Sequence, residues 1–280
     1  MRDVGLLGIH GAPRSGTTWL GQLFNSHPAV AFRYQPFFSY AFRDRVSEAS
    51  SDAAIRSFFD DLLHSNDPFV LQTGKERLAR DALEFRKEHA SWLVYKEVRF
   101  HHLLPRLLSA LPDARIIGLI RDPRAVLASW LRAPREFDAG WSIDAEWRSA
   151  RLKNADKPEN WYGFDRWREL AWLFLALSRQ YPGRFQILRY ETLLREPRET
   201  MHAALASIGL PFDAQVERFV AASSSTDSDD PYGVFRVRQD SHGWRRILPP
   251  GIACSISEEL QGTELAQFLA DDAIEEAERP

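Results

Sequence analysis

Short, mainly apolar runs alternate along the chain with longer segments in which apolar residues recur at helical spacing. The runs are rich in Leu, Ile, Val and Phe, which favours strands buried on both faces of a parallel sheet. We expect such strands at residues 4–9, 30–34, 93–98, 116–120 and 185–190. Helices are expected from near Trp19 to near Asn25, over 53–64, 76–90, 101–111, 164–181 and 198–208, and from Asp122 onward. This alternation predicts an α/β fold of parallel units with right-handed crossovers.

The residues between the first strand and the first helix form a glycine-flanked turn that runs from Gly11 to Thr18. Such a turn binds anions, because its N–H groups and the positive end of the new helix act together. The spacing is that of a nucleotide P-loop, but Thr17 stands where a lysine reaches the β- and γ-phosphates. Arg14 restores a cation with a planar fork suited to phosphate-like oxygens. The turn therefore predicts an anion site and argues against an ordinary ATPase or GTPase.

This loop resembles the 5′-phosphosulfate loop of sulfotransferases that use 3′-phosphoadenosine 5′-phosphosulfate (PAPS). The matching residues are Pro13, Arg14, Ser15, Gly16, Thr17, Thr18 and Trp19. The resemblance implies a three-layer, P-loop kinase-like α/β fold with a central, mostly parallel sheet, and transfer of a sulfuryl group to a hydroxyl or amine. The form of the loop is closer to carbohydrate and tyrosyl-protein sulfotransferases than to cytosolic steroid or phenol enzymes.

A second motif follows the expected strand at residues 116–120. Arg121 leaves the strand end and Ser129 lies eight residues later, inside a helix that begins with an Asp122 N-cap and Pro123. A guanidinium and a hydroxyl that project from this corner can hold one phosphate from two sides. The segment resembles the family motif in which an arginine and a serine at this separation bind the 3′-phosphate of PAPS. The fold and cofactor predictions depend on the two motifs together.

Further matches extend the resemblance over nearly the whole chain. Tyr190 matches a family tyrosine after a late strand, which implies that it approaches the nucleotide. Trp19 resembles a family aromatic residue beside the adenine, and a core tryptophan is the alternative interpretation. Residues 243–246 resemble a C-terminal segment that folds over PAPS, so Trp244 and Arg245 are expected to bind the cofactor.

Sulfuryl transfer resembles phosphoryl transfer, an in-line displacement in which the protein positions the reactants and stabilises spreading negative charge. Arg14 and Lys96 are the predicted cations for the oxygen that leaves toward adenosine 3′,5′-bisphosphate (PAP). Lys96 matches a family lysine on the second core strand. The alternative interpretation of Lys96 is a lysine at the edge of a strand whose ammonium reaches water. Thr17 and Thr18 supply hydroxyl and N–H groups. The predicted reaction needs no metal, and no clear metal-ligand cluster stands out.

The group that takes the acceptor's proton is where the chain departs from the family pattern. Carbohydrate and tyrosyl-protein sulfotransferases have a glutamate shortly after the first helix, but the corresponding residue here is Gln35, which cannot accept that proton. Cytosolic members use a histidine on the second core strand as the base, but in this chain Val98 falls near that position. Glu97 is the local candidate for the base, with His101 and His102 behind it. Neighbouring strand residues face opposite ways, so only one of Glu97 and the preceding lysine can point straight into the site unless the strand has ended.

The acceptor leaves a weaker signal. Tryptophan faces stack on sugars, and several tryptophans lie close together in the sequence: Trp141, Trp147, Trp161, Trp167 and Trp172. Trp167 and Trp172 belong to an expected helix, which favours a place in the core. Residues 96–99 and the tryptophan–arginine tail resemble carbohydrate enzymes, so we expect the hydroxyl of a glycan or small-molecule acceptor.

We expect a single sulfotransferase domain over residues 1–270, followed by an acidic tail over 271–280. Residues 133–163 are polar and lack a firm period, which predicts an insertion or lid. Serine and aspartate dominate the stretch from residue 223, which is typical of a mobile linker. Residues 223–246 are therefore expected to form a mobile segment that closes on the cofactor.

The composition narrows the class of protein further. With 44% hydrophobic and 27% charged residues, the 280-residue chain is ordinary for a globular protein. The net charge of −3 gives no reason to expect nucleic acid or anionic membranes as partners. The single cysteine, Cys254, excludes an internal disulfide and favours a reducing compartment. No apolar run approaches a membrane span and no leader precedes the loop, so we expect a cytoplasmic enzyme of unspecified oligomeric state, or a truncated chain.

Two alternatives to a PAPS-dependent sulfotransferase remain open from the sequence. A small-molecule P-loop kinase would need ATP and Mg²⁺, and Thr17 speaks against it. A non-catalytic protein that binds PAPS or PAP is the second alternative, and Gln35 is the residue that keeps it open.

Overall fold

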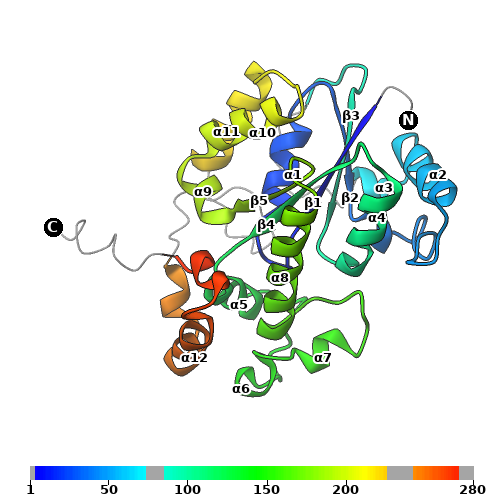
Figure 1. Cartoon of the computed structure of the whole chain (residues 1–280). Coiled ribbons are helices and arrows are strands. Elements are labelled where there is room, and N and C mark those ends of the chain that lie inside the picture. Colours follow the sequence, from blue (N-terminus) through cyan, green and yellow to red (C-terminus); the bar gives the residue numbers. More distant parts are fainter. Residues whose placement is uncertain (1–3, 74–84, 226–241, 271–280) are drawn as a thin grey trace.

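Five parallel strands form one twisted sheet in the structure, a computed structural model that describes residues 4–73, 85–225 and 242–270 (Figure 1). The strands are β1 (Gly5–His10), β2 (Val30–Tyr34), β3 (Trp92–Glu97), β4 (Arg115–Ile120) and β5 (Phe185–Arg189). Their order across the sheet is β2-β3-β1-β4-β5, and every neighbouring pair is parallel. In the central strand, Ile9 lies beside Lys96 of β3 and Ile117 of β4. All five strands therefore end at the same edge of the sheet, as the sequence predicted.

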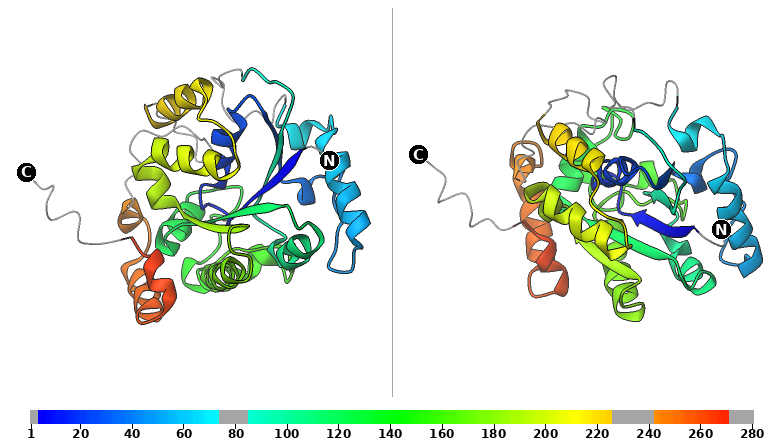
Figure 2. Two further views of the ribbon diagram at one scale, coloured as in Figure 1. Left: turned by 45° about the horizontal axis from the view of Figure 1, so that its top comes forward. Right: turned by 90° about the horizontal axis from the view of Figure 1, so that it is seen from above.

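Helices cover both faces of this sheet and complete three layers (Figure 2). The longer helices are α1 (Thr17–Asn25), α2 (Asp52–Leu63), α4 (Leu104–Ala110), α5 (Pro123–Leu131), α8 (Phe164–Gln180), α9 (Tyr190–Arg195), α10 (Pro197–Ser207), α11 (Ala214–Ser225) and α12 (Pro250–Leu260). The shorter elements are α3 (Pro68–Leu71), α6 (Ile143–Glu146), α7 (Arg151–Asn154) and the 3₁₀ helices η1 (Pro36–Phe38), η3 (His101–Leu103), η4 (Gly243–Arg246) and η5 (Glu264–Phe268). The three-layer α/β fold is the one predicted.

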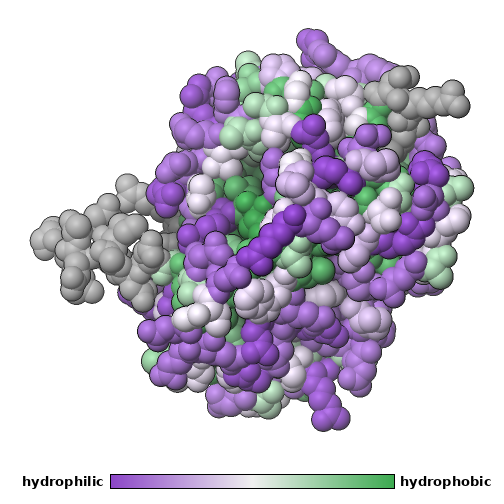
Figure 3. All heavy atoms as spheres, in the orientation of Figure 1, coloured by the Kyte–Doolittle hydropathy of each residue, from purple (hydrophilic) through white to green (hydrophobic). Residues whose placement is uncertain are grey.

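Alternation along the strands divides the core between the two faces. In β1, Leu7 and Ile9 pack with α1, α10 and α11, whereas Leu6 packs on the other face with α2 and α4. A further cluster joins α5, α8 and α12 to β4 and β5, on the face of the sheet opposite α1. The face of the molecule on which α8 lies is mainly hydrophilic, with small apolar areas between polar side chains (Figure 3).

Most predicted elements are confirmed within one or two residues, and the differences have local causes. Tyr190 was expected to end a strand but is the first residue of α9. The helix predicted over 101–111 begins as the 3₁₀ turn η3, which follows Phe100 in the left-handed region with φ of 56°. Gly209, with φ of 74°, follows α10 and supplies the expected left-handed stop.

Two long segments differ in how far the structure describes them. Residues 133–163 contain α6 and α7, and they bury Phe137, Trp161 and Tyr162 against α5 and α8. A lid function for this segment stays a prediction. The helix expected over 76–90 falls largely outside the described residues, and its described part, residues 85–90, is not helical. The mobile segment expected over 223–246 also falls mainly outside them.

Candidate active site

The loop between β1 and α1 has a backbone shape that depends on two glycines. Gly16 has φ of 91°, and a Cβ there would lie 2.5 Å from the ring of Tyr190. A Cβ on Gly11 would lie 2.7 Å from the carbonyl oxygen of Leu119. No other residue fits these positions without a shift of its neighbours. The loop delivers the unbonded N–H groups and positive end of α1 to the carboxyl edge of the sheet.

The two sequence motifs meet at Arg14. Its Nε donates a hydrogen bond of 3.2 Å to the Ser129 hydroxyl on α5. Arg121 Nη1 donates to the Arg14 carbonyl at 3.1 Å, and the Arg121 guanidinium lies over the Tyr190 ring, 4.5 Å from its centroid. Residues separated by more than a hundred positions thus form one cationic corner beside the loop.

The other loop residues differ in exposure. Pro13, Ser15 and Thr17 are buried, and Thr18 is half-buried at the start of α1.

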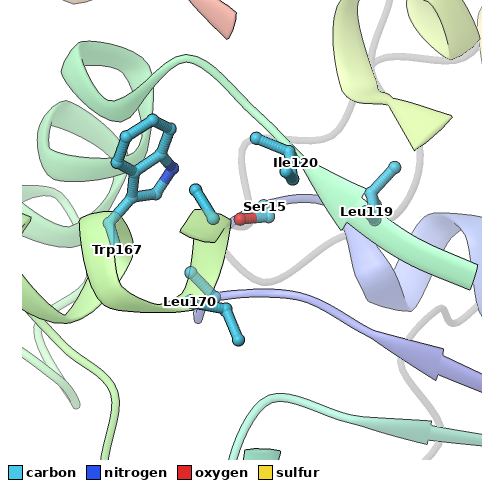
Figure 4. A pocket seen from close by; sticks show the side chains of 7 residues that line it. Ser15, Leu119, Ile120, Trp167 and Leu170 are labelled. Atoms are coloured by element: carbon cyan, nitrogen blue, oxygen red, sulfur yellow. The ribbon is translucent and has the colours of Figure 1, made fainter. Parts of the chain in front are cut away.

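Behind the loop lies a small, mostly apolar cavity that Trp167 and Leu170 of α8 enclose, with the Ser15 hydroxyl at its wall (Figure 4). Its volume is about 10 Å³, close to the space of one water molecule and far below the roughly 300 Å³ of the smaller ligand pockets. This cavity lies behind the loop and is too small for a nucleotide.

Asp122 anchors the helix that carries Ser129. Its carboxylate caps α5 by accepting from the Arg124 N–H at 2.8 Å, and it forms a buried ion pair with the Arg124 guanidinium at 2.7 Å. The same carboxylate accepts from the Ala270 N–H at 2.9 Å, which ties the C-terminal part of the described chain to α5. These bonds fix the first turn of α5 and hence the direction of its Ser129 face.

The predicted cofactor residues of the tail lie beside that same turn. Trp244 of η4 is buried, and the Arg124 guanidinium lies 4.3 Å from its ring centroid. Arg245 is exposed and lies over the outer part of the same tryptophan at 5.4 Å. η4 therefore packs on α5, and cofactor contact by Trp244 and Arg245 stays a prediction.

Trp19 occupies a buried position between α1 and α11. Its indole N–H donates to the Ser223 hydroxyl at 3.1 Å, and its ring meets the Tyr190 ring edge-on at 6.2 Å. Only 7% of the residue is exposed. These contacts fit the interpretation of Trp19 as a core residue. Tyr190, which contacts the Trp19 ring, also lies against Arg121 of the cationic corner.

Lys96 and Glu97 point to opposite faces at the end of β3. Lys96 lies on the α1 side with its ammonium 4.6 Å from the Tyr34 ring centroid, and burial lowers its pKa. Glu97 is completely buried on the other side, where its Oε1 accepts from the Phe37 N–H at 2.9 Å. Burial raises the pKa of the Glu97 carboxyl, which favours the neutral form. The role of Glu97 as the base stays a prediction: its carboxyl lies on the face opposite Lys96, and its Oε2 is buried without a hydrogen-bond partner among the described residues.

Gln35 lies in a turn that links β2 to the same strand end. It adopts the left-handed region with φ of 41°, and its N–H donates to the Lys96 carbonyl at 2.8 Å. η1 follows directly and brings Phe37 over Glu97. The structure therefore places Gln35 beside Lys96, at the edge where the strands end.

The sequence did not single out a buried polar chain beneath the loop. His10, the last residue of β1, bonds the Tyr95 hydroxyl through Nε2 and His101 through Nδ1, both at 3.1 Å. Burial lowers the pKa of His10 to about 3 and that of His101 well below its ordinary value. Both rings are therefore neutral near pH 7. A histidine at the end of an otherwise apolar run was the signal that could have revealed this chain.

A second group that the sequence did not single out comes from the segment over 133–163. The Trp130 indole donates to the Glu136 carbonyl at 3.0 Å, while Glu136 Oε2 is buried and has no hydrogen-bond partner among the described residues. The Glu136 charge acts to raise the pKa of Lys96, against the effect of burial. The Arg99 guanidinium bonds the Tyr162 side chain and lies 4.2 Å from the Phe38 ring centroid. The position of Glu136, seven residues after Ser129, was the available signal.

The described ranges contain neither a cluster of three or more His, Cys, Asp and Glu side chains able to hold a metal, nor a helix long and apolar enough to cross a membrane. A family model described as the sulfotransferase family matches residues 7–214. The chain belongs to the sulfotransferase family. The match spans the loop, both cationic motifs, the segment over 133–163 and Tyr190.

Curated relatives of this chain include carbohydrate sulfotransferases. It is 28% identical over 197 residues to carbohydrate sulfotransferase 3 of Rattus norvegicus, a match that covers 66% of this chain and 41% of the relative. It is 25% identical over 295 residues to carbohydrate sulfotransferase 5 of Homo sapiens, which covers 84% of this chain and 70% of the relative. The chain thus spans about two fifths of the length of the first relative.

Solved structures share the fold of this sulfotransferase at low sequence identity. Mouse sulfotransferase SULT7A1, solved with PAP, aligns with a TM-score of 0.56 at 12% identity, covering 95% of this chain and 87% of that one. Retinol dehydratase, solved with androsterone and PAP, aligns with a TM-score of 0.54 at 15% identity, covering 93% and 82%. These likenesses confirm the fold.

Proposed function

We propose that this protein transfers the sulfuryl group of PAPS to the hydroxyl of a glycan or small-molecule acceptor by in-line displacement, without a metal. The observation that carries the proposal is the contact between Arg14 and Ser129, with Arg121 held against the same loop. One end of this corner suits the 5′-phosphosulfate, and the other suits the 3′-phosphate.

The residues at this corner fit such a ligand. The loop has no room for a Cβ at Gly11 or Gly16, so backbone can approach an anion closely there. Ser129 accepts a bond from Arg14, which leaves its hydroxyl proton for donation to a phosphate oxygen. Arg121 lies between Tyr190 and the loop, where its charge attracts the same phosphate.

The cations divide the work of charge stabilisation. PAPS supplies an activated sulfuryl group when bound. Arg14, which bonds Ser129 from the loop, and Lys96, on the α1 face of β3, would stabilise the charge on the leaving oxygen. Both groups are fixed by neighbours before the reaction, so their stabilisation of developing charge needs little reorganisation.

The comparisons support the choice of donor and acceptor. The two structural neighbours above were solved with PAP, and the curated relatives are carbohydrate sulfotransferases. A glycan hydroxyl is therefore our preferred acceptor, with a small-molecule hydroxyl as its variant.

A thermal-shift panel of PAPS, PAP, ATP with Mg²⁺, and AMP tests the donor. We expect PAPS and PAP to raise the melting temperature most, because a ligand that binds only the folded state stabilises it. A protein stabilised by ATP and Mg²⁺ alone would be assigned to the kinase alternative. One that binds PAPS but transfers its sulfuryl group to no acceptor would be a non-catalytic binding protein.

Arg121→Ala tests the 3′-phosphate site. We expect PAP affinity to fall by roughly 1.5–3 kcal/mol, the range for hydrogen bonds to charged groups, or about 10- to 150-fold. AMP, which lacks the 3′-phosphate, should lose much less. Arg132→Ala, an exposed arginine at the end of α5, is the matched control. Equal stabilisation of the wild type by AMP and PAP would show that the 3′-site is misassigned.

A further inference from the structure

Sulfuryl transfer to a hydroxyl needs a group that accepts the hydroxyl proton. Gln35 has an amide, and Glu97 is fully buried beneath η1 with its carboxyl shifted toward the neutral form. Glu97 stays a predicted base, and its Oε2 is buried without a hydrogen-bond partner among the described residues. The turn after α5 offers a second carboxylate with the same property, Glu136.

Glu136 lies on a turn that is firmly joined to α5. The Ala133 N–H donates to the Trp130 carbonyl at 2.9 Å, and the Glu136 N–H donates to the Ala133 carbonyl at 2.8 Å. The Trp130 indole bonds the Glu136 carbonyl, and the Phe137 ring packs edge-on against Trp130 at 5.0 Å. The backbone of Glu136 is thus set one turn beyond the helix that presents Ser129.

The side chain of Glu136 is built into polar surroundings and is only partly satisfied there. Oε2 is buried without a hydrogen-bond partner among the described residues, which is costly for a carboxylate unless a ligand completes its bonding. Its charge acts on Lys96 from β3 and on Lys153 from α7, whose ammonium donates to the Arg135 carbonyl at 3.3 Å.

Other charged and polar side chains interact with the same lysines. Tyr162 lies under the Lys153 ammonium, 5.1 Å from its ring centroid, and it bonds Arg99. Arg14 also acts on Lys96 and Tyr162, so the loop cation and Glu136 flank the same pair of side chains. An acceptor bound between β3 and the segment over 133–163 would meet Glu136 on one side and Lys96 on another.

We infer that Glu136 is the catalytic base for the proposed transfer, on which this assignment rests. The acceptor oxygen forms a bond to sulfur as its proton passes to the Glu136 carboxylate. The bond from sulfur to the bridging phosphate oxygen breaks, and its electron pair leaves with PAP. Water later takes the proton from Glu136, which restores the carboxylate for the next cycle.

Glu136→Gln tests the assignment with PAP release from PAPS as the readout, across a panel of neutral monosaccharides, oligosaccharides, alcohols and phenols. We expect turnover on any active acceptor to fall by about 10²- to 10⁴-fold, the usual share of general base catalysis. Stabilisation by PAP should be unchanged, because the variant keeps the shape of the side chain. Glu136→Asp, which keeps a carboxylate, should retain part of the activity.

Asp144→Asn on α6 is the control, since it removes an exposed carboxylate from the same segment. Near-normal turnover in Glu136→Gln would overturn the inference while leaving the proposed function intact. So would a large loss in Glu97→Gln that Glu136→Gln does not share, because the base would then be Glu97. A wild type that binds PAPS but sulfates no acceptor in the panel would instead remove the proposed function itself.

Discussion

Arg14 is joined to the second motif through both its side chain and its backbone. Its Nε bonds Ser129, its carbonyl accepts from Arg121, and its φ of 73° is rare for a residue with a side chain. A strained residue that persists at a ligand-binding edge is held there by its surroundings. The sequence predicted the cation and its ligand but gave no sign of the bond to Ser129, because that bond depends on the arrangement of β1 and β4 in the sheet.

Arg14→Ala should lower turnover more than it weakens PAP binding. In the proposed reaction the guanidinium stabilises charge that develops during transfer, and removal of one preorganised donor costs about 10²- to 10³-fold in rate. Steady-state turnover of PAPS and calorimetric binding of PAP measure the two effects separately. Equal losses in both would assign Arg14 to ground-state binding alone.

The first strand, loop and helix form the part of the fold that the sequence predicted best. A continuous apolar run, two glycines and a helical repeat all agreed there, and β4 and α5 followed with similar accuracy. The segment over 133–163 was harder, because its buried Phe137, Trp161 and Tyr162 are spaced without a helical or strand period. Glu136 was missed for the same reason, since only tertiary packing brings its turn near Lys96.

Gly16→Ala tests how far the loop depends on its backbone. We expect a loss of about 1 kcal/mol or more in the free energy of unfolding from the left-handed backbone, and a further loss from the clash with Tyr190. PAP binding should also fall, because the clash can be relieved only if the loop or Tyr190 moves. Gly209→Ala is the matched control, since Gly209 also has positive φ but a Cβ added there would meet no atom within 4 Å. The variants can be compared by urea unfolding and by PAP titration, and equal behaviour would show that the Tyr190 contact is unimportant.

The molecule as a whole brings its chemistry to one edge of the sheet, with several buried ionisable groups below that edge. That edge was predictable, because parallel strands separated by helices must end together. The chain of His10, Tyr95 and His101 was not, because its three members come from β1, β3 and η3 and show no shared motif.

The two buried histidines predict a pH dependence of stability. Their folded-state pKa values are lowered, so the unfolded state binds more protons below about pH 6.5. The free energy of unfolding should therefore fall as the pH drops below 6.5, by up to about 1.4 kcal/mol per pH unit from His10 down to about pH 3, with a further loss from His101. Urea unfolding at a series of pH values measures the slope, and His10→Gln should make it shallower. An unchanged slope in that variant would assign the acid sensitivity to other groups.

The bond between Asp122 and Ala270 also bears on how the protein is made. The two residues are 148 positions apart, and the bond completes the cap of the helix that carries Ser129. Synthesis proceeds from the N-terminus, so the loop and β4 leave the ribosome long before residue 270 does. The nascent chain can form its sheet early, yet the cap of α5 is complete, and the direction of Ser129 fully fixed, only after residue 270 has been synthesised. A ribosome-bound chain stalled before residue 270 should accordingly bind PAP more weakly than the released protein.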